Sequence, residues 1–193
     1  MRIGITLTSS MHVGDEYIEL TKAVATKLAE NNHGVVFGGT DYGMMSTLAN
    51  TYKDNNGADL VGVMAKDLAE VTKGYIPFEG LDEAIWCDTM GGRKETIMEK
   101  SDAFLILPGG YGTVEELADI FGGKVNKLYD KPIAVYNHGG YYNTLIAFFD
   151  ELYTKEFSKV KFSEIVHITD NLDDVLNYYQ TYTSNKVTDK FTD

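Results

Sequence analysis

Short apolar runs alternate with amphipathic segments along almost the entire chain, and this pattern constrains the fold more than any other feature. Residues 2–7 and 103–107 are clear strand-like runs, whereas residues 14–30 carry apolar side chains at the spacing of one helical face. Further strands are expected over 35–37, 60–64, 83–87, 132–136 and 165–168. Such alternation is typical of an α/β domain, with an open, mostly parallel sheet covered by helices on both faces.

The segments between these strands predict the helices and the place of a ligand site. Helices are expected over 14–30, around 45–52, and over 92–100, 113–121, 145–152 and 172–179. Residues 65–81 are expected to form a long loop. We expect one domain over 1–183, followed by a polar, frayed tail over 184–193. Ligands of such sheets bind beyond the carboxyl ends of the strands, near the point where the strand order reverses.

The composition is that of an ordinary globular protein. Of its 193 residues, 44% are hydrophobic and 24% are charged, so the chain can form a core without disulfides or a metal. Neither a membrane span nor a signal peptide is expected, because no apolar stretch is long enough. Cys87 is the only cysteine, which excludes an internal disulfide and is compatible with a cytoplasmic location.

The charge balance limits the partners of the protein. There are 17 basic and 29 acidic residues, which gives a net charge of −12. A surface of this sign repels nucleic acids and anionic membranes, so neither is expected as a partner. It also repels a phosphorylated small molecule, which would have to be bound through local donors.

Two glycine-rich turns follow expected strands, one at residues 37–45 (FGGTDYGMM) and one at residues 107–113 (LPGGYGT). Glycines let the backbone approach a ligand, and the following helix adds its positive N-terminal end, so both turns are candidate phosphate sites. The alternative is that each is only a tight strand-to-helix turn. Neither matches the dinucleotide fingerprint or the P-loop, which argues against NAD and ATP. Ser9 and Ser10 follow the first strand and either donate to a ligand at the same edge or form a turn.

Two cations begin the helix expected over 92–100. Arg93 and Lys94 lie in its first turn, where positive charge opposes the helix dipole at a cost of up to ~1 kcal/mol. A local cost without structural return indicates a functional role. The alternative is a solvated charge cluster balanced by Glu95 and Glu99.

Glu116 has two interpretations. Thr113 and Glu116 have the spacing of a capping box, in which Thr113 is the N-cap and Glu116 its reciprocal partner. A carboxylate one turn into a helix, beside a phosphate-binding loop, is also placed to face a bound sugar. The sequence leaves both open. The four histidines have no metal-like spacing, so no metal is expected.

In this order, the motifs resemble those of the LONELY GUY (LOG) family, the cytokinin riboside 5′-monophosphate phosphoribohydrolases. Residues 108–116 match the family's PGGxGTxxE motif in full, residues 90–94 resemble MHxRK, and residues 38–45 resemble GGGxxGLM. Residues 131–133 and 140–142 resemble later blocks, so that the resemblance covers roughly residues 1–180. Gly91 stands in place of the motif's histidine, Thr40 replaces a glycine, and residues 121–129 lack the family's Trp-x-Gln-Leu-Gly pattern.

The resemblance implies a Rossmann-like fold and an enzyme without a cofactor. Members hydrolyse the N-glycosidic bond of nucleoside 5′-monophosphates, here AMP or N6-modified AMP (cytokinin ribotides), to the free base and ribose 5-phosphate. Arg93 and Glu116 correspond to the catalytic pair. The expected phosphate and ribose contacts are Gly39, Gly109, Gly110, Gly112 and Thr113, with Lys94 adjacent.

The resemblance also implies an assembly and leaves a rival function. The family forms homodimers or higher oligomers, and we expect the subunits to meet near the helices that carry Ile97, Leu117, Ile120 and Phe121. The same broad group includes molybdenum-cofactor carriers, which bind a phosphorylated pterin without a hydrolytic pair. Some relatives have been labelled lysine decarboxylases, but nothing in this sequence indicates that reaction, which needs a pyridoxal cofactor or an equivalent.

Overall fold

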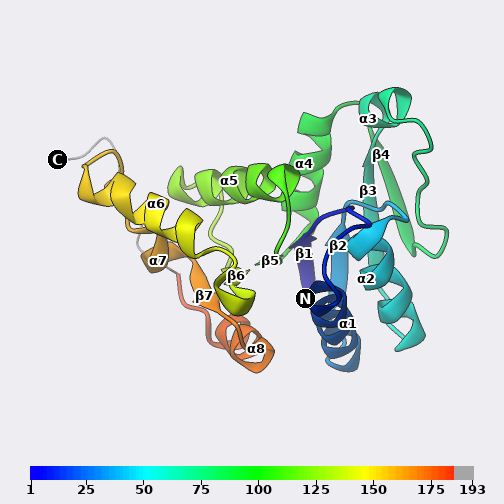
Figure 1. The fold of residues 1–193 in the computed structure, drawn as a ribbon, viewed down its shortest axis with the longest axis horizontal. Coiled ribbons are helices and arrows are strands. Elements are labelled where there is room, and N and C mark those ends of the chain that lie inside the picture. Colours follow the sequence, from blue (N-terminus) through cyan, green and yellow to red (C-terminus); the bar gives the residue numbers. More distant parts are fainter. Residues whose placement is uncertain (185–193) are drawn as a thin grey trace.

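The computed structural model describes residues 1–184, and its strands form one parallel sheet (Figure 1). The sheet has seven strands in the order β4-β3-β2-β1-β5-β6-β7, and every neighbouring pair is parallel. The strands are β1 (Arg2–Thr6), β2 (Gly34–Phe37), β3 (Leu60–Ala65), β4 (Glu83–Cys87), β5 (Ala103–Ile106), β6 (Ile133–Tyr136) and β7 (His167–Thr169).

Helices cover both faces of this sheet, as the alternating pattern predicts (Figure 1). One face is covered by α1 (Asp15–Glu30), α2 (Gly43–Asp54) and α8 (Leu172–Thr181). The other is covered by α4 (Met90–Lys100), α5 (Tyr111–Val125), α6 (Asn143–Thr154) and α7 (Phe162–Ile165). The short helix α3 (Lys66–Val71) follows β3, and the 3₁₀ turn η1 (His138–Gly140) follows β6. The expected α/β architecture is confirmed.

The central strand β1 shows how the sequence divides between the two faces. Ile3 and Ile5 are buried in the core cluster that contains residues of α1. Side chains alternate across a strand, so Gly4 and Thr6 face the layer of α4 and α5. Accordingly, a Cβ built on Gly4 would lie 3.0 Å from Phe104, which belongs to the cluster on that side.

Several expected boundaries differ from the structure. Residues 65–81 are not entirely loop, because α3 forms over Lys66–Val71. This segment holds good helix formers but is too short to show a clear apolar period. The last expected strand is shifted, since Ile165 ends α7 and β7 begins at His167. Residues 185–193 of the expected tail lie outside the described part, so the division into a domain and a tail stays a prediction.

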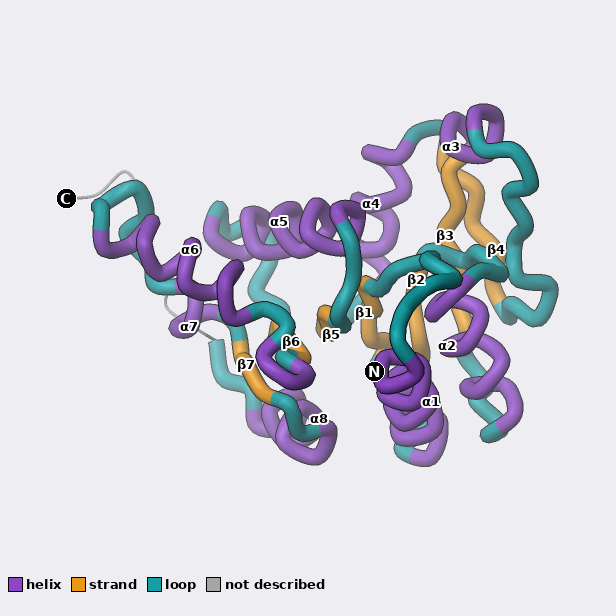
Figure 2. The backbone as a smooth tube through the Cα atoms, viewed as in Figure 1, coloured by secondary structure: helices purple, strands orange, loops and turns teal. Residues whose placement is uncertain are grey.

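The strand order reverses between β1 and β5. From β1, the chain adds β2, β3 and β4 on one side, then returns to place β5 on the other side of β1. The connections that leave the carboxyl ends of β1 and β5 therefore run to opposite sides of this point in the sheet. Figure 2 shows the loops that follow these strands. Among residues 1–184, no helix is long and apolar enough to cross a membrane.

Candidate active site

A cavity of about 360 Å³ lies at this reversal point. Its walls come from the segments after β1, β2, β3 and β5 and from the first turns of α4 and α5. Of the residues predicted to form the site, Arg93, Gly110, Gly112, Thr113 and Glu116 line it. Ser9 also lines it. Gly39, Gly109 and Lys94 do not.

Arg93 and Glu116 form a buried ion pair at the floor of this cavity. Nη1 of Arg93 donates to Oε1 of Glu116 over 2.8 Å, and Nε donates to the backbone carbonyl of Val63 over 2.9 Å. The side chains are 6% and 12% exposed, respectively. Because the guanidinium is held by both a strand and a neighbouring helix, it presents the Glu116 carboxylate in one orientation.

Burial and the ion pair act on Glu116 in opposite directions. Burial raises the pKa of the Glu116 carboxyl above its usual range, while the nearby Arg93 guanidinium lowers it. Burial is the larger effect. A carboxylate with a raised pKa in a cavity is typical of a group that takes part in chemistry rather than in surface solvation.

The capping-box interpretation of Glu116 is wrong. Helix α5 begins at Tyr111 with Gly110 as its N-cap, so Thr113 is already the third helical residue. The helix begins two residues before the predicted start at Thr113, because the glycine turn leads directly into it. The only hydrogen bond of the Glu116 side chain among the described residues goes to Arg93.

The second glycine turn has the features of an anion site. Within the described part, no side chain caps the start of α5, whose first residues line the cavity. Thr113 is 3% exposed, and its buried hydroxyl has no hydrogen-bond partner in the structure. A Cβ at Gly109 would lie 2.1 Å from this hydroxyl, so Gly109 provides the space for it. A phosphate at this point would meet backbone donors and the positive end of a helix, next to the Thr113 side chain.

The first glycine turn is a structural support for the cavity. Gly39 has a φ of +74°, a conformation that favours glycine. The turn is joined to the loop after α3, since Asp41 donates its N–H to the Ile76 carbonyl over 2.8 Å. Phe78 likewise donates its N–H to the Gly39 carbonyl over 2.9 Å. These contacts hold residues 38–42 and 74–78 together as one wall.

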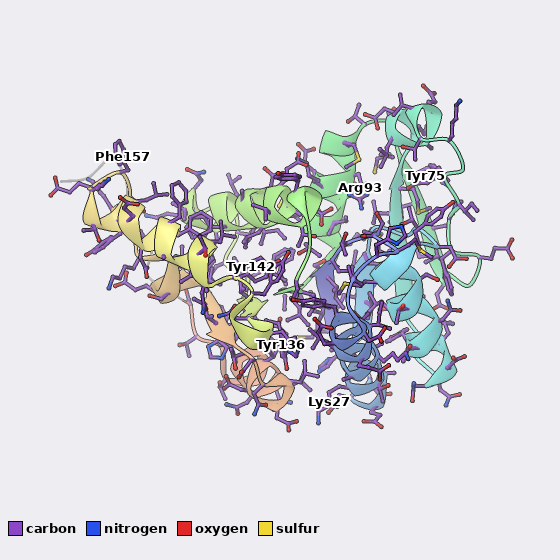
Figure 3. The ribbon with its side chains drawn as sticks, viewed as in Figure 1. Lys27, Tyr75, Arg93, Tyr136, Tyr142 and Phe157 are labelled. Atoms are coloured by element: carbon purple, nitrogen blue, oxygen red, sulfur yellow. The ribbon has the colours of Figure 1, made fainter. Side chains whose placement is uncertain are left out.

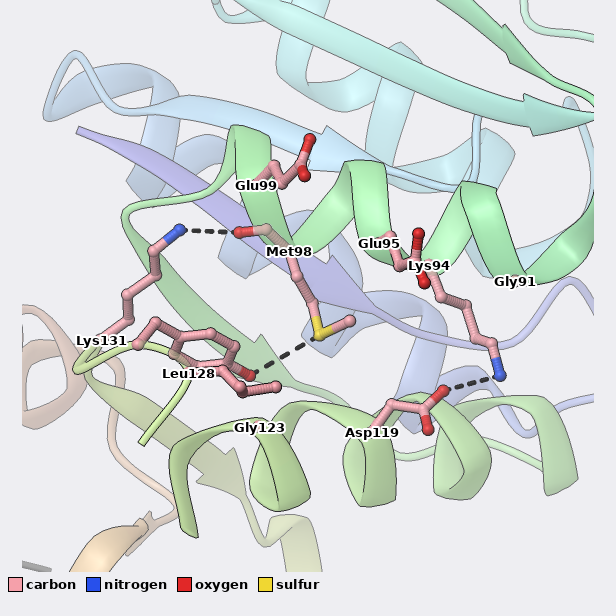
Figure 4. Close-up of a pocket in the computed structure, with 10 residues that line it drawn as sticks. Gly91, Lys94, Glu95, Met98, Glu99, Asp119, Gly123, Leu128 and Lys131 are labelled. Carbon is pink, nitrogen blue, oxygen red and sulfur yellow. Dashed lines mark hydrogen bonds and ion pairs between the residues drawn. The ribbon is translucent and has the colours of Figure 1, made fainter. Parts of the chain in front are cut away.

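Lys94 lies on a different side of α4 from Arg93. Its ammonium group pairs with Glu115 over 2.7 Å and with Asp119 over 2.6 Å, both on α5. It lines a groove between α4 and α5 (Figure 4). These partners differ from Glu95 and Glu99, which the alternative interpretation of a solvated charge cluster named, because α5 packs directly against α4.

The segment after β3 forms one wall of the cavity, which the sequence did not predict. Leu68 of α3, Thr72 and Tyr75 all line the cavity, and Figure 3 shows Tyr75 near Arg93 at the same end of the molecule. Tyr42, from the first glycine turn, also lines it and donates to the Gly74 carbonyl. The helix-forming residues of 66–70 were the one local signal for this wall. No local pattern indicates that Tyr75 faces a cavity.

Within residues 1–184, no group of three or more His, Cys, Asp or Glu side chains is placed to hold a metal ion. The absence of a metal remains a prediction.

The relatives of this chain agree with the motifs. The model of a family described as "Possible lysine decarboxylase" matches residues 45–179. Cytokinin riboside 5′-monophosphate phosphoribohydrolase LOG2 of Arabidopsis thaliana is 30% identical over 183 residues, which cover 94% of this chain and 83% of that protein. The LOG1 phosphoribohydrolase of the same plant is 33% identical over 158 residues, 81% of this chain and 71% of that protein.

Solved structures share the fold at lower identity. The molybdenum cofactor carrier protein of Chlamydomonas reinhardtii has a TM-score of 0.69 at 17% identity, covering 93% of this chain and 95% of that one. The molybdenum cofactor binding protein of Rippkaea orientalis has a TM-score of 0.65 at 16% identity, with the same coverage. These likenesses confirm the expected Rossmann-like fold and no more. The family model spans most of the chain and LOG2 matches it almost throughout, so this chain belongs to the LOG family, whose family model is described as possible lysine decarboxylase.

Proposed function

We propose that this protein hydrolyses the N-glycosidic bond of nucleoside 5′-monophosphates, AMP or N6-modified AMP, to the free base and ribose 5-phosphate. The observation that carries this proposal is the buried Arg93–Glu116 pair, which lies beside an uncapped helix N-terminus in one cavity. The carboxylate of the pair is suited to stabilising a developing positive charge, and the helix N-terminus is suited to binding a phosphate. Family membership supports the same reaction, since LOG1 and LOG2 are named as cytokinin riboside 5′-monophosphate phosphoribohydrolases.

Different residues of the cavity bind the phosphate and stabilise the reacting sugar. The start of α5 and the Thr113 hydroxyl hold the 5′-phosphate, so that binding energy away from the scissile bond positions the ribose. As the bond between C1′ and the base nitrogen breaks, the sugar gains oxocarbenium character, which the Glu116 carboxylate stabilises. Water adds to C1′ and the base leaves with a proton. Arg93 orients the carboxylate and lowers its pKa against the effect of burial.

The rival function is a carrier of a nucleotide or a phosphorylated cofactor, as in the structural neighbours. A carrier has a use for the anion site but none for a carboxylate beside the sugar. The buried Arg93–Glu116 pair therefore favours the hydrolase. A lysine decarboxylase is not supported, because among the described residues that line the cavity there is no lysine to bind a pyridoxal group.

We further propose a homodimer whose interface includes the groove between α4 and α5. This groove has a volume of about 610 Å³ and is lined by Met98, Leu128 and Tyr129, with Lys94 and Asp119 at one end (Figure 4). Leu128 is 78% exposed in the single chain, so a large apolar side chain is available there.

Of the apolar residues on these helices, Ile97, Leu117 and Ile120 are each at most 4% exposed, because they pack within the subunit, and Phe121 is partly buried. The proposed interface therefore lies on the same two helices but uses other side chains. A cytoplasmic location stays a proposal that rests on the single cysteine.

The decisive experiment is incubation of the purified protein with a panel of nucleosides and nucleoside monophosphates, followed by chromatography of the free base. We expect release from AMP or an N6-modified AMP, and much slower release from the matching nucleoside, which lacks the phosphate. Equal rates on adenosine and AMP would contradict the phosphate site. Tight nucleotide binding without any base release would favour the carrier.

A further inference from the structure

Two tyrosines from the segment after β6 bind the glycine turn that precedes α5. The Tyr141 hydroxyl donates to the Gly109 carbonyl over 2.8 Å, and the Tyr142 hydroxyl donates to the Leu107 carbonyl over 2.7 Å. These partners are 32 and 35 positions apart in the sequence. They meet because β6 pairs with β5 in parallel, so that the segments after both strands leave the same edge of the sheet.

The chain after β6 is folded back toward the turn by two glycines and an asparagine. Gly139 and Gly140 have φ values of +56° and +79°, which favour glycine. Asn137 accepts the Tyr142 N–H through Oδ1 over 2.7 Å and donates through Nδ2 to Asn143 over 2.8 Å. The rings of the two tyrosines contact each other edge-on, with their centroids 4.9 Å apart. The position of both hydroxyl groups is therefore set by this segment.

The bond to Gly109 fixes the direction of one N–H group. No peptide bond within residues 1–184 is cis, and in a trans peptide the carbonyl and the N–H of the next residue point in opposite directions. Because the Gly109 carbonyl points to Tyr141, the Gly110 N–H points away from Tyr141. Gly110 lines the active-site cavity, whereas Gly109 and Tyr141 do not. The bond therefore keeps a carbonyl, which would repel a phosphate, away from the cavity.

The turn needs such an anchor because its glycines are free to change conformation. A Cβ built on Gly110 or Gly112 would meet no atom within 4 Å, so packing does not confine the backbone there. Glycine also has access to more backbone conformations than any other residue. Among the described residues, Tyr141 is the only donor to the Gly109 carbonyl. Without this bond, the peptide between Gly109 and Gly110 can rotate and present its carbonyl to the ligand.

We propose that Tyr141 is a positioning residue for the substrate phosphate, and that its hydroxyl holds the Gly109–Gly110 peptide so that the Gly110 N–H donates to the 5′-phosphate. This inference rests on the proposed function, in which the start of α5 binds that phosphate. Tyr141 itself does not touch the substrate. Loss of its hydroxyl removes a donor from the phosphate and allows a carbonyl to face it, so the effect is confined to ligands that carry a phosphate.

The test measures binding of AMP and of adenosine by isothermal titration calorimetry in the wild type and in Tyr141→Phe, which keeps the ring. We expect the affinity for AMP to fall about tenfold, the value of one hydrogen bond to a charged group, and the affinity for adenosine to stay the same. In base release from AMP, KM should rise by a similar factor while kcat stays within about twofold, because the lost contact is already made in the ground state.

Two other tyrosines provide matched controls. The Tyr17 ring packs against Tyr141 with the centroids 5.8 Å apart, and its hydroxyl has no hydrogen-bond partner within the described residues, so Tyr17→Phe should leave both affinities unchanged. Tyr142→Phe removes a similar bond to the same turn, but the peptide after Leu107 leads into Pro108 and has no N–H to direct. This variant should melt at a lower temperature and keep the ratio of AMP affinity to adenosine affinity.

A purely structural role of Tyr141 gives a different result. Tyr141→Phe would then melt at a lower temperature but keep the wild-type ratio of AMP affinity to adenosine affinity, which would overturn the proposal. An equal loss of AMP affinity in Tyr142→Phe would also overturn it, because the direction of the Gly110 N–H would not be the cause. A wild type that binds AMP no more tightly than adenosine has no phosphate contact to position, and this too would overturn it.

Failure of the hydrolase function is detected separately. A wild type that binds AMP more tightly than adenosine but releases no base is not a hydrolase. A selective loss of AMP affinity in Tyr141→Phe would still support the role of Tyr141 in that protein.

Discussion

Nη2 of Arg93 lies where a side chain at Gly38 would have to stand: a Cβ built on Gly38 would be 2.3 Å from that atom. The turn after β2 and the helix α4 are thus fitted to each other through one guanidinium group. The Arg93 side chain cannot move aside easily, because its Nε and Nη1 donate hydrogen bonds to the Val63 carbonyl and to Glu116. The glycine is required here by the close approach of Arg93.

The substitution Gly38→Ala is therefore expected to reduce turnover more than stability. The new methyl group displaces the Arg93 guanidinium and with it the Glu116 carboxylate, so base release should fall by at least tenfold. Gly122→Ala on α5 is the control, because a Cβ there meets no atom within 4 Å and should stabilise the helix slightly. Base release and thermal melts of both variants check this. Normal turnover in Gly38→Ala would show that the position of Arg93 is not critical.

Glu116→Gln tests the charge of the carboxylate. The glutamine side chain can still accept from Arg93, so the fold and nucleotide binding should be kept. It cannot oppose a positive charge on the sugar, and turnover should fall by a factor on the order of 10² or more. Glu115→Gln is the matched control, since Glu115 is 57% exposed and pairs with Lys94 in the groove. Similar losses in both variants would contradict a specific role for Glu116.

Arg93→Ala is expected to abolish turnover and also to destabilise the protein. It leaves the buried Glu116 and the Val63 carbonyl without their partner, a loss of about 3–5 kcal/mol for a broken buried pair. Removal of Arg93 also relieves its unfavourable position in the first turn of α4, but that effect is at most ~1 kcal/mol and does not offset the loss of the buried pair.

The stability deficit of Arg93→Ala should depend on pH. The pKa of Glu116 is already raised in the folded state, and loss of Arg93 raises it further. Above the ordinary carboxyl pKa, the folded variant holds a proton that the unfolded chain has released, so its stability falls as pH rises. Thermal melts should show the smallest deficit relative to wild type below about pH 4. If the loss of stability in Arg93→Ala does not change with pH, it is caused by lost packing and not by the titration of Glu116.

Thr113→Val tests the phosphate site. The valine keeps the shape and removes a hydroxyl that has no partner within the protein, so stability should not fall. If the hydroxyl binds the 5′-phosphate, kcat/KM for AMP should drop about ten- to hundredfold, the value of a hydrogen bond to a charged group. Residual turnover of adenosine should stay the same. An equal drop for AMP and adenosine would place the hydroxyl near the sugar instead.

Leu128→Glu tests the assembly. A charge at the centre of an apolar contact should convert the dimer to a monomer at micromolar concentration, as measured by light scattering. Phe157→Glu is the control, since Phe157 is 82% exposed and lies at the far end of the molecule from Arg93 (Figure 3). Wild-type protein that is already monomeric would contradict the homodimer. A Leu128→Glu protein that stays dimeric would place the interface elsewhere.

Local pattern was sufficient for the fold class and for the motif residues. The alternation of strand-like and helical periods predicts a parallel sheet with helices on both faces, because parallel strands must be joined by crossovers. It also predicts that the loops after β1, β2 and β5 meet at one edge. Arg93 and Glu116 were named as the catalytic pair through the resemblance of their motifs to those of the LOG family, and that assignment stays a prediction.

Tertiary structure alone decided how these residues meet. Arg93 and Glu116 are 23 positions apart, and their ion pair replaces the capping box that the spacing around Thr113 suggests. Lys94, next to Arg93 in sequence, turns to α5 because successive helical residues point in different directions. The wall at Leu68 and Tyr75 forms because the loop after α3 bonds to the first glycine turn. Periodicity is a local property of the chain, whereas these contacts depend on packing between segments that are distant in sequence, and no local pattern encodes them.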